Sequence, residues 1–115
     1  DIEKNEEYLT DDAEAIIVAY GTISRSARYA VDVLRKEGIK AGLFRPITLW
    51  PFPEQRMAEL ANQAKAVVVP EMNLGQLILE IERVTRRVCP IEGIGRVDGE
   101  PITPAEIVAK VKEVL

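Results

Sequence analysis

The chain has 115 residues, of which 47% are hydrophobic and 30% are charged, with a net charge of −4. This length fits one domain, and the acidic balance argues against nonspecific binding to nucleic acid, which needs clustered Lys and Arg. The sequence contains no histidine and one cysteine, Cys89. It therefore lacks the usual general base and the commonest metal ligand, and one thiol can form neither an internal disulfide nor a four-thiolate iron–sulfur site.

The longest purely apolar runs, 15–20 and 66–69, are far shorter than the ~20 residues that a membrane-spanning helix needs. No basic-then-apolar leader is present, and a lone cysteine fits a reducing compartment. We therefore expect a cytoplasmic protein without membrane contact. Because the chain starts at Asp1 and not at methionine, we also expect it to be a piece of a longer polypeptide.

Strand patterns and helix patterns alternate after the polar segment 1–12. The β-branched run 15–20 is typical of a strand covered on both faces. Alternation with short connections predicts one α/β domain over 13–115: a three-layer α/β/α sandwich with a parallel sheet, preceded by 1–12 as a linker. In chain order, the predicted elements are a strand at 15–20, a helix at 24–37, a strand at 40–44, a helix from Pro53, a strand at 66–69, a helix at 75–87, a strand at 88–94 and a last helix after Thr103.

Local signals set several of these boundaries. Ser24 is placed to cap the first helix and Gly38 to end it, while Asp32 and Lys36 are spaced as an i,i+4 ion pair on its outer face. Pro70 is expected to close its strand. Proline at the first helical position opens two helices, at Pro53 and Pro104. The last helix begins with the capping box Thr-Pro-Ala-Glu at 103–106; Ile102 can pack on Ile107, and the apolar stripe comprises Ile107, Val108, Val111 and Leu115.

Ligands of open parallel sheets gather beyond the carboxyl ends of the strands. Gly21–Arg25, after the first strand, could bind an anion together with Arg28, but the sequence lacks both dinucleotide-binding and P-loop glycine patterns, which favours a plain turn and helix cap. Glu71 follows the third predicted strand, where a lone carboxylate more often orders a loop or caps the next helix than catalyses a reaction. Cys89 is interpreted as a small buried hydrophobe.

The most unusual stretch is Arg-Pro-Ile-Thr-Leu-Trp-Pro-Phe-Pro at 45–53. Its prolines fix φ, so this loop loses little entropy on docking. Two interpretations stay open: the loop packs its own aromatics against the sheet, or it is a docking surface, since Trp and Phe beside Arg are typical of interface hot spots. The candidate interface residues are Arg45, Trp50, Phe52, Glu71 and Asn73; no catalytic, cofactor-binding or metal-binding residue is predicted.

Several phrases together resemble one family. They are Ala-Tyr-Gly-Thr at 19–22, Val-Leu-Arg-Lys-Glu-Gly at 33–38, Leu-Phe-Arg-Pro at 43–46, Leu-Trp-Pro-Phe-Pro at 49–53, Glu-Met-Asn-Leu-Gly-Gln at 71–76 and the tail at 97–107. In order and spacing they look like domain II, the C-terminal domain of the α subunit of 2-oxoacid:ferredoxin oxidoreductases. The wider kin are the C-terminal domains of transketolase and of pyruvate dehydrogenase β subunits.

The resemblance implies a five-stranded mixed sheet with one antiparallel edge strand, for which 7–9 is the candidate. It also implies oxidative decarboxylation of a 2-oxoacid, with 2-oxoglutarate favoured over branched-chain acids, using thiamine diphosphate, iron–sulfur clusters, coenzyme A and ferredoxin. In that family, thiamine diphosphate and the clusters belong to other domains and subunits, so no cofactor is expected in this domain. The implied partners are the N-terminal domain of the same α subunit, the β and other subunits and, indirectly, ferredoxin.

Two other functions stay open on the sequence. An independent flavodoxin-like binding or regulatory module would need an acidic phospho-acceptor cluster or a flavin-phosphate loop, where this chain has Tyr20-Gly21-Thr22. A small enzyme in its own right is disfavoured by the absence of histidine. The first function, an assembly domain of a larger oxidoreductase, accounts for the missing catalytic groups best.

Overall fold

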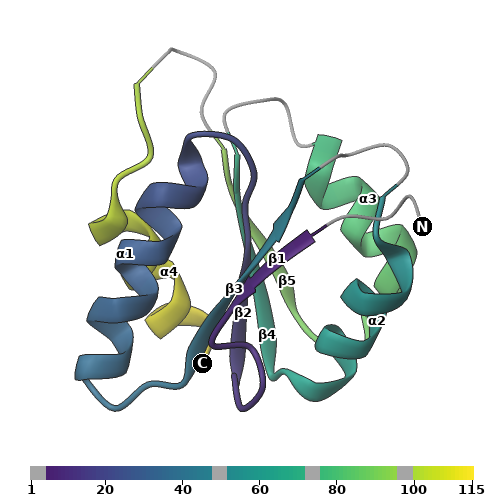
Figure 1. Ribbon diagram of the computed structural model, residues 1–115, viewed down its shortest axis with the longest axis horizontal. Helices are drawn as coiled ribbons and strands as arrows, with labels where there is room; N and C mark the ends of the chain where they lie inside the picture. The colour runs from purple at the N-terminus through teal and green to yellow at the C-terminus, as the bar shows by residue number, and fades with distance from the viewer. Residues whose placement is uncertain (1–4, 48–51, 72–75, 96–99) are drawn as a thin grey trace.

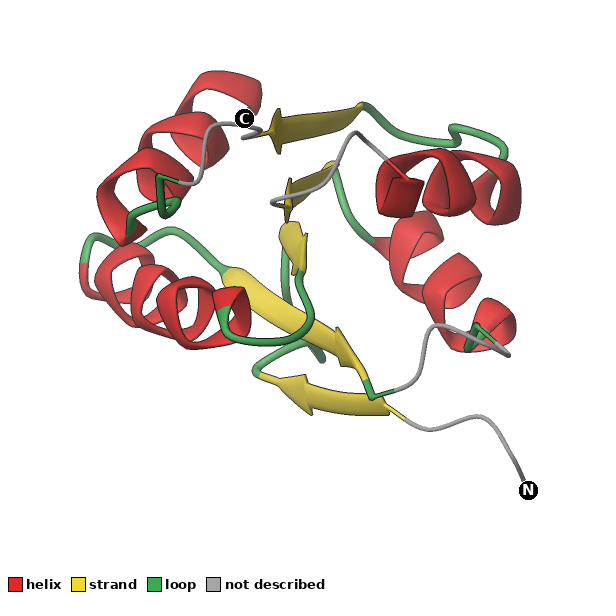
Figure 2. Ribbon diagram, turned by 90° about the horizontal axis from the view of Figure 1, so that it is seen from above, coloured by secondary structure: helices red, strands yellow, loops and turns green. Residues whose placement is uncertain are grey.

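The protein is described by a computed structural model that covers residues 5–47, 52–71, 76–95 and 100–115. Its elements form a three-layer α/β/α sandwich, with α1 and α4 on one face of the sheet and α2 and α3 on the other (Figures 1 and 2). In chain order they are β1 (Asn5–Tyr8), β2 (Ala15–Val18), α1 (Ile23–Lys36), β3 (Ala41–Pro46), α2 (Glu54–Gln63), β4 (Ala66–Glu71), α3 (Gln76–Thr85), β5 (Ile91–Gly95) and α4 (Pro104–Val114).

The sheet has five strands in the order β1-β3-β2-β4-β5. The strands β2 to β5 pair in parallel, and β1 pairs antiparallel with β3, with Asn5 opposite Pro46 and Tyr8 opposite Leu43. This mixed sheet confirms the predicted fold class. The edge strand ends one residue earlier than expected because Leu9 has a φ of 58° and turns the chain toward β2.

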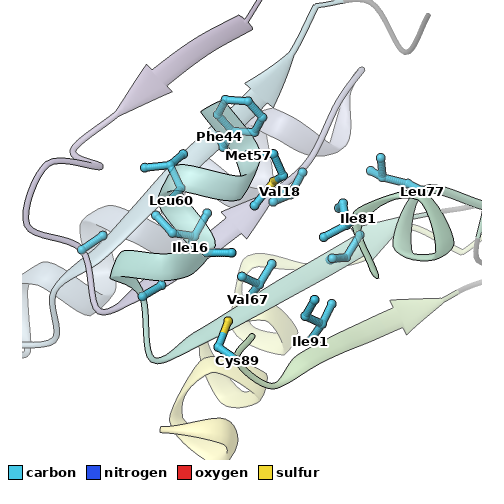
Figure 3. Close-up of a cluster of buried hydrophobic side chains, with 14 of the residues drawn as sticks. Ile16, Val18, Phe44, Met57, Leu60, Val67, Leu77, Ile81, Cys89 and Ile91 are labelled. Atoms are coloured by element: carbon cyan, nitrogen blue, oxygen red, sulfur yellow. The ribbon is translucent and has the colours of Figure 1, made fainter. Parts of the chain in front are cut away.

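The core lies on both faces of β2 and β4. All four residues of β2 and all six of β4 are buried, as their apolar runs predicted. Ile16 and Val67 face α2 and α3, where they meet Met57 and Ile81 (Figure 3). Ile17 packs toward α1 and α4. A sheet covered on both faces is therefore built from strands without polar alternation.

The first helix begins and pairs differently from the prediction. Its N-cap position is Thr22, with no side-chain cap hydrogen bond, and Ser24 lies inside the first turn, where its hydroxyl donates to the Gly21 carbonyl at 2.7 Å. Asp32 accepts a hydrogen bond from Tyr8 at 2.5 Å, and no ion pair joins it to Lys36 in the described structure. The predicted Ser24 cap is wrong, because the helix already begins at Ile23. The predicted Asp32 pair is wrong, because Tyr8 of β1 offers Asp32 a partner from outside the helix.

Two prolines also lie elsewhere than predicted. Pro53 is the N-cap of α2, one position before the first helical residue. Pro70 lies within β4, opposite Ile94 of β5, and does not close the strand at 69. Backbone N–H groups along a strand point alternately to its two neighbours. Val67 donates its N–H to the Pro90 carbonyl on the β5 side. Pro70 is three residues further on, so its nitrogen points to the other neighbour, β2. Pairing between β2 and β4 ends at Val68, because the next nitrogen on that side, that of Pro70, has no hydrogen to donate.

The ends of α1 and α4 otherwise follow the sequence. Gly38 has a φ of 84° and ends α1. In α4, Thr103 Oγ1 accepts from the Glu106 N–H and Glu106 Oε1 accepts from the Thr103 N–H, which confirms the capping box. The last stripe residue, Leu115, is 47% exposed, because it is the C-cap of a helix that ends at Val114. Among the described residues, no helix has the length and apolarity to cross a membrane.

Candidate functional site

The carboxyl ends of β2, β3, β4 and β5 meet at one edge of the sheet, called here the carboxyl rim. Its described residues include Gly21 after β2, Arg45 and Pro46 of β3, Glu71 of β4 and Gly95 of β5. Two of the five candidate interface residues, Trp50 and Asn73, fall outside the described residues. The other three differ in burial: Arg45 is half-exposed, while Phe52 and Glu71 are buried.

Glu71 supports the helix that follows it. The residue is 3% exposed, and its carboxylate accepts hydrogen bonds from the backbone N–H groups of Leu77 at 3.2 Å and Ile78 at 3.1 Å. These N–H groups belong to the first turn of α3, where a helix has no internal acceptors and attracts negative charge. The interpretation of Glu71 as a cap is therefore confirmed.

Phe52 belongs to the core. It is 2% exposed and packs with Phe44 and Met57 in the cluster between the sheet and α2 and α3. For this residue the structure matches the first interpretation of the proline-rich loop, in which aromatics pack against the sheet. Phe52 offers no surface to a partner while this core is intact.

Arg45 remains accessible. Its side chain is 39% exposed and forms an ion pair with Glu6 of β1, with 2.8 Å between Nη1 and Oε1. The exposed fraction of the Glu6 side chain is 63%, so water screens this pair and its contribution to stability is small. A guanidinium held this weakly can exchange its partner for a carboxylate of another chain.

A groove with a volume of about 540 Å³ lies where β1 and β3 extend past the N-terminal half of α1. The register pairs Glu6 with Arg45 and Tyr8 with Leu43, which places all four side chains on the α1 face of the sheet. Arg25 and Arg28 come from α1. We call this site the arginine groove; its lining residues are Glu6, Glu7, Tyr8, Ser24, Arg25, Arg28, Leu43 and Arg45.

Tyr8 joins the strands to the helix at this groove. The Arg28 guanidinium lies 4.0 Å from the centre of the Tyr8 ring, and the Tyr8 hydroxyl donates to Asp32 Oδ1 at 2.5 Å. The hydrogen bond to Asp32 raises the pKa of Tyr8 above its ordinary value. The Tyr8 hydroxyl therefore stays protonated near neutral pH and continues to donate its hydrogen bond to Asp32 of α1.

Sequence reasoning found Arg25 and Arg28 as anion-binding candidates and Arg45 as an interface candidate, but it did not bring them together. Tyr8 and Glu6 were missed. The signal that unites them is the antiparallel register of β1, and a four-residue polar strand has no apolar alternation from which that register could be read.

Cys89 lies in the core cluster on the α2 and α3 face, as expected for a small hydrophobe (Figure 3). Burial raises the pKa of its thiol, which keeps it protonated and weakly nucleophilic. Within the described ranges, no group of three or more His, Cys, Asp or Glu side chains could hold a metal ion.

Curated proteins with similar sequences are named as subunits of a ketoisovalerate oxidoreductase and of a 2-oxoglutarate synthase. The chain is 44% identical to ketoisovalerate oxidoreductase subunit VorB of Methanothermobacter thermautotrophicus, over 98% of this chain and 33% of that protein. It is 40% identical to 2-oxoglutarate synthase subunit KorA of Methanothermobacter marburgensis, over 89% of this chain and 27% of that protein. The chain thus spans about a third of the length of these relatives.

Solved structures share the fold. A 2-oxoglutarate:ferredoxin oxidoreductase from Magnetococcus marinus, with 2-oxoglutarate, coenzyme A and succinyl-CoA bound, matches with a TM-score of 0.83 and 29% identity, over 96% of this chain and 19% of that one. A split-gene transketolase in an inactive β4 tetramer matches with a TM-score of 0.84 and 27% identity, over 97% of this chain and 41% of that one. The expected likenesses to 2-oxoacid:ferredoxin oxidoreductases and to transketolase are confirmed.

The family described as pyruvate:ferredoxin oxidoreductase core domain II matches residues 13–107, which is most of the sandwich from the start of β2 into α4. This match and the two groups of relatives agree with the phrases that carried the resemblance. The chain belongs to the pyruvate:ferredoxin oxidoreductase core domain II family.

Proposed function

We propose that this chain is an assembly domain, without catalytic groups of its own, of the α subunit of a thiamine diphosphate-dependent 2-oxoacid:ferredoxin oxidoreductase. The single observation that carries the proposal is the family match over residues 13–107. The relatives are named as subunits of a ketoisovalerate oxidoreductase and of a 2-oxoglutarate synthase and are about three times as long. The whole enzyme would convert a 2-oxoacid and coenzyme A to an acyl-CoA and pass electrons to ferredoxin. Family membership favours this function over a free-standing flavodoxin-like module.

The side chains best suited to chemistry support an assembly role, because each is committed to structure. Glu71 caps α3, Cys89 is buried with a raised pKa, and Glu7 is ion-paired with Arg56 at 2.6 Å. We assign thiamine diphosphate, the iron–sulfur clusters and coenzyme A to the rest of a cytoplasmic complex.

The carboxyl rim is the proposed contact surface. Arg45 is accessible there, and we propose that Trp50 and Asn73 join it against the N-terminal domain of the same subunit and against the β and other subunits; ferredoxin is reached through them. Phe52 and Glu71 support this surface without contacting the partner. Phe52 anchors the chain after the proline-rich loop in the core, and Glu71 fixes the start of α3.

The proposed activity is tested on the whole enzyme. The complete subunit that contains this chain is produced with its partner subunits, and coenzyme A-dependent reduction of ferredoxin is measured with 2-oxoglutarate, ketoisovalerate and pyruvate. We expect activity with at least one 2-oxoacid and predict 2-oxoglutarate as the preferred one. The names of the relatives include both 2-oxoglutarate and ketoisovalerate, so both are compared. An assembled complex that oxidises none of the three contradicts the proposal.

Trp50→Ala tests the contact surface. If Trp50 anchors an interface, the change weakens assembly by at least ~2 kcal/mol while the domain keeps its stability. If Trp50 belongs to the core, the change lowers the free energy of unfolding by ~3–5 kcal/mol instead. Subunit co-purification and denaturant unfolding separate these outcomes. Tyr29→Ala is the control, because Tyr29 is a 62% exposed aromatic of α1 away from the carboxyl rim.

A further inference from the structure

The geometry points to a specific occupant for the arginine groove: we propose that it docks an acidic polypeptide segment from the rest of the enzyme. The inference rests on the proposed function, since it takes the chain to be one domain of a larger assembly. It adds a second contact surface, on the flank formed by α1, β1 and β3. The recognised chemistry is a pair of carboxylates on one extended segment.

Among the described residues, the groove offers one cation, Arg25, that the domain itself does not neutralise. Arg25 and Arg28 are three residues apart on α1, which places them on the same side of the helix, and both are exposed. Within the ranges described above, no hydrogen bond or ion pair engages the Arg25 side chain. Its position in the first turn of α1 adds the positive end of the helix dipole. A carboxylate arriving here therefore meets an uncompensated guanidinium.

Arg28 is held ready for such a partner. Its guanidinium lies over the Tyr8 ring at 4.0 Å, and Tyr8 is fixed in turn by its 2.5 Å hydrogen bond to Asp32. Arg28 also hydrogen-bonds the Tyr8 hydroxyl. A guanidinium has five N–H donors, so others at the edge of its plane can still bind a carboxylate. Because the side chain is already ordered by Tyr8, binding loses less conformational entropy than it would with a mobile arginine.

The mixed lining favours a polypeptide over a compact anion such as phosphate. Glu6 lies in the same groove and repels a concentrated negative charge, whereas an extended segment can place its carboxylates near the helix arginines and a donor beside Glu6. Tyr8 and Leu43 add an apolar floor. A volume of about 540 Å³ exceeds that of a single carboxylate and admits several side chains.

The groove also continues to the proposed contact surface. Arg45 lines it and lies at the end of β3, on the carboxyl rim. Its ion pair with Glu6 is exposed, so a carboxylate of the partner can replace Glu6 at small cost. One partner domain could then contact Arg45 and the two helix arginines together.

Zero-length carbodiimide cross-linking of the whole complex tests the occupant directly. Arg25→Lys keeps the positive charge and introduces an amine that couples only to a carboxylate in contact with it. We expect mass spectrometry to find this amine joined to an Asp or Glu of another domain or subunit, in an acidic segment. The exposed Lys36 on the last turn of α1 is the internal control and should not couple to that segment. Cross-links from position 25 to Glu6 or Glu7 alone, or none at all, overturn the proposal.

Charge reversal gives the functional readout. Arg25→Glu should weaken assembly at least about tenfold, while Lys36→Glu, the same charge change on the same helix, should have little effect. Arg25→Glu breaks no contact within the domain, so misfolding is not its expected effect. Normal assembly of this variant contradicts the docking role, and normal assembly with a raised KM for coenzyme A assigns the groove to a compact anion instead. Cross-linking needs no catalysis, so the two proposals are tested separately. The docking proposal can fail while 2-oxoacid oxidation is confirmed, and it can hold in a complex that oxidises none of the 2-oxoacids tested.

Discussion

The two edges of the sheet are stabilised in different ways. At one edge, β1 pairs with β3 along its whole length but buries no residue, and side chains hold it to the helices: Glu7 pairs with Arg56 of α2, and Tyr8 bonds Asp32 of α1. At the other edge, β5 joins β4 by parallel backbone pairing along its whole length and buries Ile91 in the core. Polar contacts with both helical layers therefore replace hydrophobic burial at β1, and single polar substitutions should affect that edge most.

The turn from β1 to β2 packs directly against the backbone of β3. A Cβ at Gly42 of β3 would lie 2.6 Å from the Leu9 carbonyl oxygen and 3.0 Å from Thr10 Cα. Both are backbone atoms of the turn, so they cannot move aside without moving β1. Arg35 of α1 joins this turn to β3 by donating to the carbonyl of Leu9 at 2.8 Å and to that of Ala41 at 2.9 Å.

Gly42→Ala is expected to have the largest effect. Because the new methyl group would overlap backbone, it should lower the free energy of unfolding by about 3 kcal/mol. Chemical denaturation measures the loss. The same change at β5 is the matched control: a Cβ at Gly95 meets nothing within 4 Å, so Gly95→Ala should stay within about 0.5 kcal/mol of the natural chain. If Gly42→Ala and Gly95→Ala lower the free energy of unfolding equally, the backbone is not packed more closely at the β1 edge than at the β5 edge.

Arg35→Ala should come next, with a loss of about 2 kcal/mol. This change removes charged hydrogen bonds to two carbonyl groups and an ion pair to Asp12 at 2.7 Å. Arg83→Ala is the control near the other edge. Arg83 also has acidic partners, Glu54 and Glu80, but its side chain is 56% exposed, so its loss should cost less than about 1 kcal/mol. Thermal unfolding that shifts more for Arg83→Ala would contradict the comparison.

Most of the fold could be predicted because apolar periodicity records burial. The run at 15–20 and the run at 66–69 gave the two central strands, and the capping box gave the start of α4 to the residue. Pro70 shows where such reasoning ends. Pro70 ends the pairing of β4 with β2, but its pairing with β5 continues through Glu71, and the sequence does not show which neighbour the proline nitrogen faces.

The candidate site could be predicted only in pieces. Glu71 was identified as a cap because its partners follow within seven residues of the chain. The arginine groove joins residues of β1 and β3 that are 39 positions apart, as the Glu6–Arg45 hydrogen bond shows. Such a contact follows from the register of an edge strand, and the resemblance to a family supplied the strand but not its register.

The helix after β5 gives a smaller test, since its contribution comes from a cap and not from the sheet edge. Thr103→Ala should cost about 1 kcal/mol, because the Glu106 N–H loses its acceptor. Thr22→Ala is a control of the same chemistry, as Thr22 occupies the N-cap of α1 without a side-chain cap hydrogen bond and should cost close to nothing. If both variants unfold at the same denaturant concentration, the start of α4 is frayed in solution.

The smallest expected effect is a pH dependence that belongs to the β1 edge. The hydrogen bond from Arg56, followed by that from Thr10, holds the pKa of Glu7 below its ordinary value. A carboxylate whose pKa is lower in the folded chain stabilises the fold above its unfolded pKa, which is about 4.3, and this stabilisation is lost as pH falls through the folded value. As the pH is lowered from about 5 to about 3, the free energy of unfolding should therefore fall more for the natural chain than for the Glu7→Gln variant. Glu80→Gln is the control, because the pKa of Glu80 is also lowered, by its hydrogen bond from Arg83. Arg83 lies three residues along the same helix, so this pair does not join a strand to a helix and its difference should be smaller. Denaturant unfolding at a series of pH values measures both differences, and parallel curves for the natural chain and Glu7→Gln would mean that the pairing with Arg56 does not stabilise β1.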